Sequence, residues 1–310
     1  MIALLAPGQG AQSPGMLSPW LELDSAGERI DAWSAAAKLD LRRLGTTADA
    51  DEIKDTAITQ PLIVALSLLA HEELTRRIDL PPDTIVAGHS VGELAAAAIA
   101  GVLNADDAVE LAALRGAAMA AACALEPTGM SAVLGGDEEQ VLARLAELGL
   151  EPANVNGAGQ IVAAGPLAAL EELAARRPDG ARVMPLKVSG AFHTRFMASA
   201  RDALAERAAA MRAHDPHRPL LSNADGAEVT SGGELLRRLV AQVTSPVRWD
   251  ACMATMQARG VTATIELPPA GPLTGLAKRE LKGITTLAVK TPDHLDTVAE
   301  LINDLAGSRA

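Results

Sequence analysis

The sequence contains no tyrosine, and phenylalanine and tryptophan together make up only 2% of its 310 residues. It has no basic excess either, because 39 acidic residues against 27 lysines and arginines give a formal net charge of −12. Proteins that bind nucleic acids without sequence preference stack bases on aromatic side chains and attract phosphates with basic ones. The composition therefore disfavours a nucleic-acid partner, and the core must be packed mainly from aliphatic side chains and alanine.

Cysteines and long hydrophobic runs are also scarce. Cys123 and Cys252 are too few and too far apart for a metal pattern or a disulfide framework, which favours a reducing compartment. The longest apolar run, from Pro61 to Ala70, is too short to span a bilayer. The apolar N-terminus lacks a basic segment and ends at Pro7, which predicts a first strand rather than a signal peptide. We expect a cytoplasmic protein with no membrane partner and no metal.

Hydrophobic residues make up 49% of the chain, enough for a sizeable core. Strand-like runs alternate with helical patterns, which predicts an α/β fold with a mostly parallel sheet covered on both faces. Between the two parts of this pattern, the order changes to βα and then ββαβ, which is typical of a ferredoxin-like α+β unit. We predict a large domain from residues 1–126 and 189–310, and a small subdomain from residues 127–188.

Three local features are also predicted. Pro61 lies in the first turn of a helix that opens at Thr56, where a missing N–H is harmless. Asp106 and Asp107 cap a long alanine-rich helix that reaches about Ala124. Residues 246–249 begin a further helix.

The stretch from Gly88 to Gly92 has the pattern Gly-x-Ser-x-Gly. A β-branched run at residues 84–86 precedes it, and an alanine-rich run at residues 94–100 follows it. A strand, this pattern and a helix in that order are typical of a nucleophile elbow, which presents the serine hydroxyl on a sharp turn. The alternative is a simple turn without chemistry. We favour Ser90 as a nucleophile.

A serine hydroxyl needs a general base to attack a carbonyl near neutral pH. Of the six histidines, His193 lies in a loop of small residues and is the best candidate. His89 is next to the serine, but neighbouring side chains on an elbow point apart, so we interpret it as a packing or hydrogen-bonding residue of the turn. No acidic residue stands out as the group that orients the base. That group could be a carboxylate, an amide or a backbone carbonyl.

Two other features give only weak signals by themselves. The glycine-rich loop at residues 7–12 lacks the third glycine of a dinucleotide fingerprint, because Ser13 occupies that position. Spacing alone therefore favours a structural turn. Arg115 lies on the long alanine-rich helix that reaches about Ala124, and an arginine in such a position is usually solvated.

Taken together, these motifs resemble the malonyl-CoA:acyl carrier protein transacylases, which include stand-alone enzymes and domains of polyketide synthases. The resemblance covers nearly the whole chain in the family's order. It is carried by the segments Gly8–Gln12, Gly88–Glu93, Leu114–Gly116, Asn154–Asn156, Ala191–His193, Val240–Gln242 and Leu273–Arg279. It implies an α/β-hydrolase-like core with a ferredoxin-like subdomain.

The resemblance also implies roles for single residues. Ser90 would be the nucleophile, His193 its base, and the backbone carbonyl of Gln242 the group that orients His193. The backbone N–H groups of Gln9 and Val91 would form the oxyanion hole, which replaces the structural interpretation of the first loop. Further residues would bind the substrate, with Arg115 on the malonyl carboxylate and the pocket lined by Gln60, Asn154, Asn156 and Phe192.

Phe192 matches the malonyl-selective version of the family, in which the phenyl ring fills the space of an α-methyl group. A methyl-sized difference is worth about 1–3 kcal/mol, so this selectivity is expected to be partial. Gly190 departs from the pattern, since many malonyl-selective polyketide domains have histidine there.

The implied reaction is transfer of malonyl from malonyl-CoA to the phosphopantetheine thiol of an acyl carrier protein, through a Ser90 ester, for fatty-acid synthesis. It needs no cofactor, and we expect a monomer. Carrier proteins are usually acidic, so docking requires a basic patch, for which the candidates are Lys278 and Arg279, helped by Arg182 and Lys187. The alternatives are a serine esterase or thioesterase, a different acyl group or carrier protein, and a non-catalytic scaffold.

Overall fold

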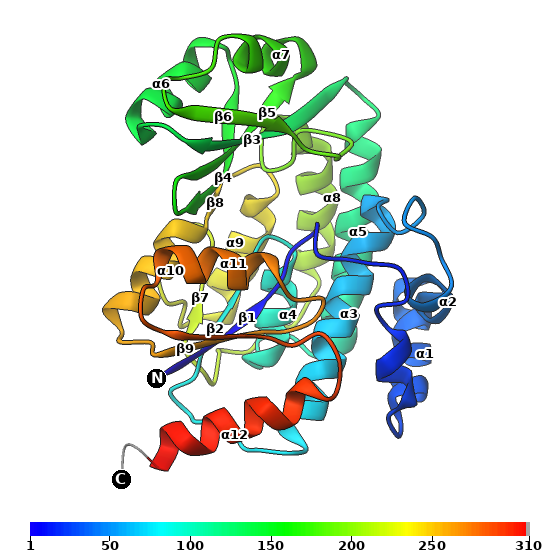
Figure 1. Ribbon diagram of the computed structural model, residues 1–310. Helices are drawn as coiled ribbons and strands as arrows, with labels where there is room; N and C mark the ends of the chain where they lie inside the picture. Colours follow the sequence, from blue (N-terminus) through cyan, green and yellow to red (C-terminus); the bar gives the residue numbers. More distant parts are fainter. Residues whose placement is uncertain (308–310) are drawn as a thin grey trace.

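The computed structural model describes residues 1–307, and its centre is a five-stranded sheet in the order β10-β9-β1-β2-β7 (Figure 1). All of its pairings are parallel. The strands are β1 (Ile2–Ala6), β2 (Ile85–Gly88), β7 (Leu220–Leu221), β9 (Ala263–Glu266) and β10 (Thr285–Ala288). β1 is buried along its whole length, as expected for a parallel strand between two helical layers.

Alternate residues of β1 belong to two different cores. Leu4 packs into a large core with α3 (Thr56–Thr75), α4 (Gly92–Ile99), α5 (Ala105–Cys123), α8 (Ala198–Ala209), α9 (Gly232–Gln242) and α12 (His294–Gly307). Leu5 packs into a smaller core with α10 (Trp249–Ala258) and α11 (Pro272–Glu280). Because successive strand residues point to opposite faces, helices cover both faces of the sheet. The predicted α/β fold class is confirmed.

A second five-stranded sheet lies at one end of the molecule, at the top of Figure 1, in the order β6-β3-β5-β4-β8. Its first four strands and two helices are β3 (Thr128–Gly135), α6 (Glu138–Glu147), β4 (Glu151–Gly157), β5 (Gln160–Pro166), α7 (Leu167–Ala175) and β6 (Ala181–Pro185). This βαββαβ order and antiparallel pairing are those of a ferredoxin-like unit. Val133, Leu145 and Leu173 are part of its own small core.

The remaining elements lie at the edge of the large core. They are η1 (Ser18–Glu22), α1 (Ala26–Ala37), α2 (Leu41–Thr46) and η2 (Arg195–Met197). The three tryptophans Trp20, Trp33 and Trp249 are fully buried, so the few aromatic rings of this chain serve packing. Within residues 1–307, no helix is both long enough and apolar enough to cross a membrane.

Three local predictions were wrong. α3 begins at Thr56, capped by the Asp55 carboxylate, so Pro61 lies inside the helix rather than in its first turn. The cap of α5 is Asn104, whose side chain accepts the N–H of Asp107. Residues 247–248 form β8 (Val247–Arg248), which pairs in parallel with β4 before α10 begins. A two-residue strand has no periodicity of its own, so only the tertiary pairing defines it.

Candidate active site

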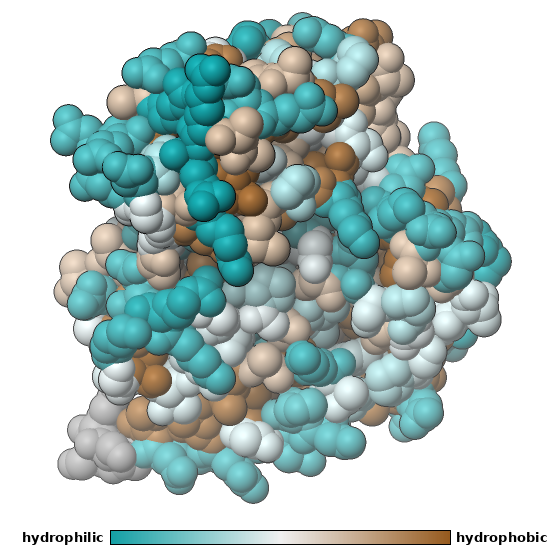
Figure 2. All heavy atoms as spheres, turned by 45° about the horizontal axis from the view of Figure 1, so that its top comes forward, coloured by the Kyte–Doolittle hydropathy of each residue, from teal (hydrophilic) through white to brown (hydrophobic). Residues whose placement is uncertain are grey.

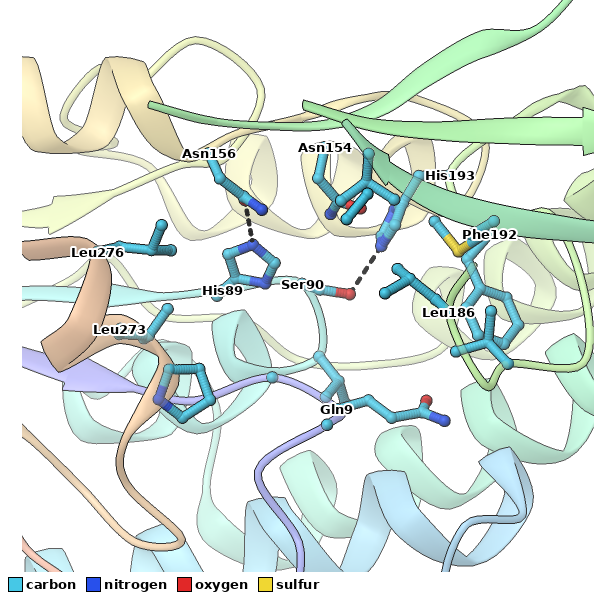
Figure 3. Close-up of a pocket in the computed structure, with 18 of the residues that line it drawn as sticks. Gln9, His89, Ser90, Asn154, Asn156, Leu186, Phe192, His193, Leu273 and Leu276 are labelled. Atoms are coloured by element: carbon cyan, nitrogen blue, oxygen red, sulfur yellow. Dashed lines mark hydrogen bonds between the residues drawn. The ribbon is translucent and has the colours of Figure 1, made fainter. Parts of the chain in front are cut away.

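The loops after β1, β2, β7 and β9 meet at one edge of the parallel sheet, because the carboxyl ends of parallel strands lie together. This edge faces the ferredoxin-like unit across a cavity of about 590 Å³. Residues of both parts line the cavity, and Figure 2 shows the surface recessed between them. Figure 3 shows the side chains that converge there.

The turn after β2 has the geometry of a nucleophile elbow. Ser90 has a backbone φ of 55°, which L residues rarely adopt and which is common at functional sites. A Cβ atom on Gly88 would lie 2.0 Å from the backbone of Gly92, and one on Gly92 would lie 2.3 Å from the Ala6 carbonyl oxygen. Only glycine fits both positions, so the two glycines of the pattern allow the turn to pack against itself and against β1.

Ser90 and His193 are in direct contact. The Ser90 Oγ lies 2.7 Å from the His193 Nε2 (Figure 3). The His193 Nδ1 lies 2.8 Å from the backbone carbonyl oxygen of Gln242. A carbonyl only accepts hydrogen bonds, so Nδ1 carries the proton and Nε2 presents its lone pair to the hydroxyl. The alternatives left open by the sequence reduce to one, because the group that orients His193 belongs to the main chain.

The pKa of His193 is lowered to about 3, first by burial and then by the nearby Arg115 charge. The imidazole is therefore neutral at physiological pH, which is the form that can accept a proton. The contribution of neutral His193 to stability is full above its unfolded pKa of 6.5. It is lost as the pH falls toward 3, because the unfolded chain then binds a proton that the folded chain does not.

For a reaction in which the Ser90 hydroxyl attacks and His193 takes its proton, this pKa predicts tolerance of acid. The kcat/KM for the acylation that the sequence resemblance implies, which reports the free enzyme, should remain flat from about pH 8 down to about pH 5. It can be measured from CoA release, with fluorescence of the buried tryptophans as the control for folding. A half-loss of kcat/KM between about pH 6 and 7 in protein that is still folded would contradict the assignment.

Arg115 is only 3% exposed, so the expectation of a solvated arginine from spacing alone was wrong. Its Nη1 donates to the Gln60 Oε1 at 2.6 Å, and its Nη2 donates to the Gln242 Oε1 at 2.9 Å. The same Nη2 lies 3.3 Å from the Ser90 Oγ. Burial lowers the pKa of Arg115 to about 10, which still leaves the guanidinium charged at neutral pH. A fixed cation therefore lies beside the serine hydroxyl.

Two backbone N–H groups are available near Ser90. Gln9 and Val91 both line the cavity, and within residues 1–307 no hydrogen bond occupies the N–H group of either residue. A Cβ on Gly8 would lie 2.7 Å from the His89 carbonyl oxygen, so glycine allows the first loop to approach the elbow closely. The Gln9 side chain donates to the Thr56 hydroxyl, which fixes the loop from the other side.

The two asparagines on β4 differ in their surroundings. The Asn156 Oδ1 lies 2.9 Å from the His89 Nε2, and the Asn156 Nδ2 donates to the Gln160 Oε1. His89 also packs edge-on against Trp249, so its interpretation as a packing and hydrogen-bonding residue is confirmed. Asn154 lines the cavity, and its carboxamide makes no hydrogen bond within the part of the chain that the structure describes. Only Asn154 is therefore placed to offer a free amide to a ligand.

Phe192 is buried and lines the cavity on the side of Leu186 (Figure 3). The departure at Gly190 has a steric reason, because a Cβ there would lie 2.4 Å from the Cys123 Sγ. The cysteine sulfur occupies the space that a larger residue at 190 would need.

Basic side chains surround the cavity. Arg279, Lys187 and Lys54 line it, and Lys278 is exposed on the same helix as Arg279 without being part of the lining. Arg182 is exposed on β6. Sequence reasoning missed Lys54, since the loop before α3 carries no motif. No group of three histidine, cysteine or acidic side chains within residues 1–307 is arranged to hold a metal.

Sequence reasoning also missed two buried polar residues behind the elbow. Asn223 accepts the backbone N–H of Ser90 at 2.8 Å and donates to the Gly88 carbonyl at 2.8 Å. Glu93 accepts the backbone N–H of Asn223 at 2.7 Å. A signal was present, because Asn223 lies two residues after a short buried strand and Glu93 is the last residue of the elbow motif.

Comparison with known proteins agrees with this geometry. The model of the acyl transferase domain family matches residues 4–303, so the chain belongs to this family and is an acyltransferase. The relatives it resembles are malonyl CoA-acyl carrier protein transacylases. The chain is 63% identical to that of Mycobacterium tuberculosis (strain ATCC 25618 / H37Rv) over 302 residues, 97% of this chain and 100% of the relative. It is 33% identical to that of Escherichia coli (strain K12), over 96% of this chain and 99% of the relative.

Solved structures give the same result. The crystal structure of MCAT from Mycobacterium tuberculosis matches with a TM-score of 0.93 and 62% identity, covering 96% of this chain and 99% of that chain. A malonyl-transacylase in complex with a type II PKS acyl-carrier protein matches with a TM-score of 0.89 and 30% identity, covering 96% and 99%.

Proposed function

We propose that this chain transfers a malonyl group from malonyl-CoA to the phosphopantetheine thiol of an acyl carrier protein in fatty-acid synthesis, through an ester on Ser90. One observation carries the proposal: a serine activated by a buried neutral histidine lies 3.3 Å from a buried arginine. A serine–histidine pair suits acyl transfer, and a buried guanidinium suits an acyl group that ends in a carboxylate. The names of the relatives support the same substrate and acceptor.

In the proposed first half-reaction, the Ser90 Oγ attacks the thioester carbonyl while the His193 Nε2 takes its proton. The N–H groups of Gln9 and Val91 stabilise the tetrahedral oxyanion, and a single such donor is worth about 2.7–4 kcal/mol. The C–S bond then breaks, and the CoA thiolate takes the proton from His193. In the second half-reaction, the carrier-protein thiol gives its proton to His193, attacks the ester and releases the Ser90 hydroxyl.

Arg115 would bind the malonyl carboxylate, since a charged group in this cavity needs a partner. Phe192 would fill the space next to the α-carbon and disfavour methylmalonyl. The basic rim of Lys54, Lys187 and Arg279 would receive the acidic carrier protein. All of these groups come from one chain, which supports a monomeric enzyme. The proposal also keeps two expectations from the sequence, a cytoplasmic location and a reaction without a cofactor.

The test is intact-protein mass spectrometry after brief exposure to malonyl-CoA. We expect a malonyl adduct that is discharged by a fatty-acid carrier protein much faster than by water, and less adduct from methylmalonyl-CoA under the same conditions. Free malonate without transfer would indicate a hydrolase. Faster discharge by a polyketide carrier protein would assign the enzyme to polyketide synthesis instead of fatty-acid synthesis, and transfer through the Ser90 ester would remain the proposed mechanism.

A further inference from the structure

Behind the proposed catalytic groups lies a continuous set of buried polar side chains, which we call the buried network: Gln60, Glu93, Arg115, Asn223 and Gln242. Each of them is at most 5% exposed. The mechanism above uses the backbone carbonyl of Gln242 and the guanidinium of Arg115. It gives no role to Glu93 or to the carboxamide of Gln242.

The Gln242 carboxamide connects Glu93 to Arg115. Its Oε1 accepts the Arg115 Nη2 at 2.9 Å, while its Nε2 donates to the Glu93 Oε2 and, at 3.4 Å, to the Asn223 Oδ1. Only this orientation of the amide is compatible with its neighbours. After a flip of the amide, its NH₂ group would face the guanidinium, donor against donor.

Glu93 is surrounded by donors. Its two oxygens receive the backbone N–H of Asn223 and the Gln242 Nε2, and the Ser222 hydroxyl also bonds to it. Burial raises the pKa of Glu93, while these donors and the Arg115 charge favour its ionised form. Because a donor faces each oxygen, the surroundings require the ionised carboxylate, which accepts hydrogen bonds at both oxygens.

No carboxylate within residues 1–307 forms an ion pair with Arg115. The nearest acidic group of the network, Glu93, is one amide away. A direct pair would occupy the guanidinium N–H groups that a substrate carboxylate needs. The inserted amide allows Glu93 to hold Arg115 in place and leaves the guanidinium open toward the cavity.

We propose that Glu93 is a positioning residue, which acts through the carboxamide of Gln242 to hold Arg115 toward the carboxylate of the acyl substrate. This inference rests on the proposed function, because it assumes that Arg115 binds malonyl. It predicts a selective defect: Glu93 should matter for malonyl and much less for acetyl, which has no carboxylate.

The experiment compares malonyl and acetyl transfer from the CoA thioesters in Glu93→Gln, Arg115→Ala and the control Glu73→Gln. The amide introduced by Glu93→Gln has the shape of the carboxylate but offers one acceptor and one NH₂ group. Its NH₂ group must therefore face either the Asn223 N–H or the Gln242 Nε2, both of which are donors. We expect Glu93→Gln to raise KM for malonyl-CoA about tenfold or more, and to change acetyl transfer less than about threefold. Glu73 is also buried, and it is paired with Arg76 on α3, so Glu73→Gln should keep the wild-type ratio.

An exchange variant gives the sharpest readout. In Glu93→Gln/Gln242→Glu, the amide now at position 93 donates to the carboxylate now at position 242, and that carboxylate accepts from Arg115. The net charge and the backbone carbonyl at position 242 are kept. We expect the malonyl-to-acetyl ratio to stay at least about tenfold below wild type, because the carboxylate at position 242 pairs directly with the guanidinium N–H groups that the substrate carboxylate needs. If Glu93→Gln does not fold, Gln242→Met removes the bridging amide and should give the same selective loss.

Equal losses for both substrates in Glu93→Gln, or an exchange variant with the wild-type malonyl-to-acetyl ratio, would overturn the positioning role. These failures are distinct from failure of the proposed function. If Arg115→Ala keeps the malonyl-to-acetyl ratio, the assignment of Arg115 itself fails. If Arg115→Ala loses the ratio and Glu93→Gln keeps it, only the inference about Glu93 fails.

Discussion

Replacing Ser90 with alanine is expected to lower kcat/KM for malonyl transfer about 10⁴-fold or more and to abolish the malonyl adduct. The physical reason is that the variant keeps the oxyanion donors and the pocket but has no atom that can form the ester. Stopped-flow detection of CoA release and intact mass together measure both effects.

His193→Ala should have an effect of similar size, because Ser90 and His193 act as one unit across their 2.7 Å contact. The double variant should therefore be no slower than the slower single variant. Multiplicative losses would mean that the two residues act independently, and a persistent adduct in Ser90→Ala would place the ester on another residue.

The second large effect is expected from Arg115→Ala. Removing one partner of a desolvated charge pair typically costs about 2–5 kcal/mol, so malonyl transfer should fall about 30-fold to 1,000-fold or more. Acetyl transfer should fall far less, because acetyl has no charge to pair. The measurement is the ratio of kcat/KM for malonyl-CoA and acetyl-CoA.

Arg115→Lys is the matched control for this prediction. Lysine keeps the charge but loses the planar fork that donates to both Gln60 and Gln242. We expect it to recover only part of the malonyl preference. Equal losses of malonyl and acetyl transfer in Arg115→Ala would refute the carboxylate-binding role.

The parts that local pattern specifies were predicted correctly. A strand, two spaced glycines around a serine, and a helix define the elbow, because tight packing at Gly88 and Gly92 leaves few alternatives. Alternation of strands and helices indicated the parallel sheet, because neighbouring parallel strands need a crossover connection that is usually a helix. Predictions of local secondary structure were wrong where a tertiary contact determines the conformation. Residues 247–248, for example, form a strand only because they pair with Asn154 and Val155.

The sequence by itself determined the elbow serine and the two kinds of sheet, since each follows from local spacing and propensity. It made His193 the best candidate for the base only by comparison with the other histidines. The tertiary structure decided what those residues can do. It brought the Gln242 carbonyl to His193 over 49 positions of sequence and buried Arg115 next to Ser90. It also placed Glu93 behind Gln242, 149 positions apart. The physical reason is that burial and donor–acceptor pairing arise between distant segments, so no local pattern records them.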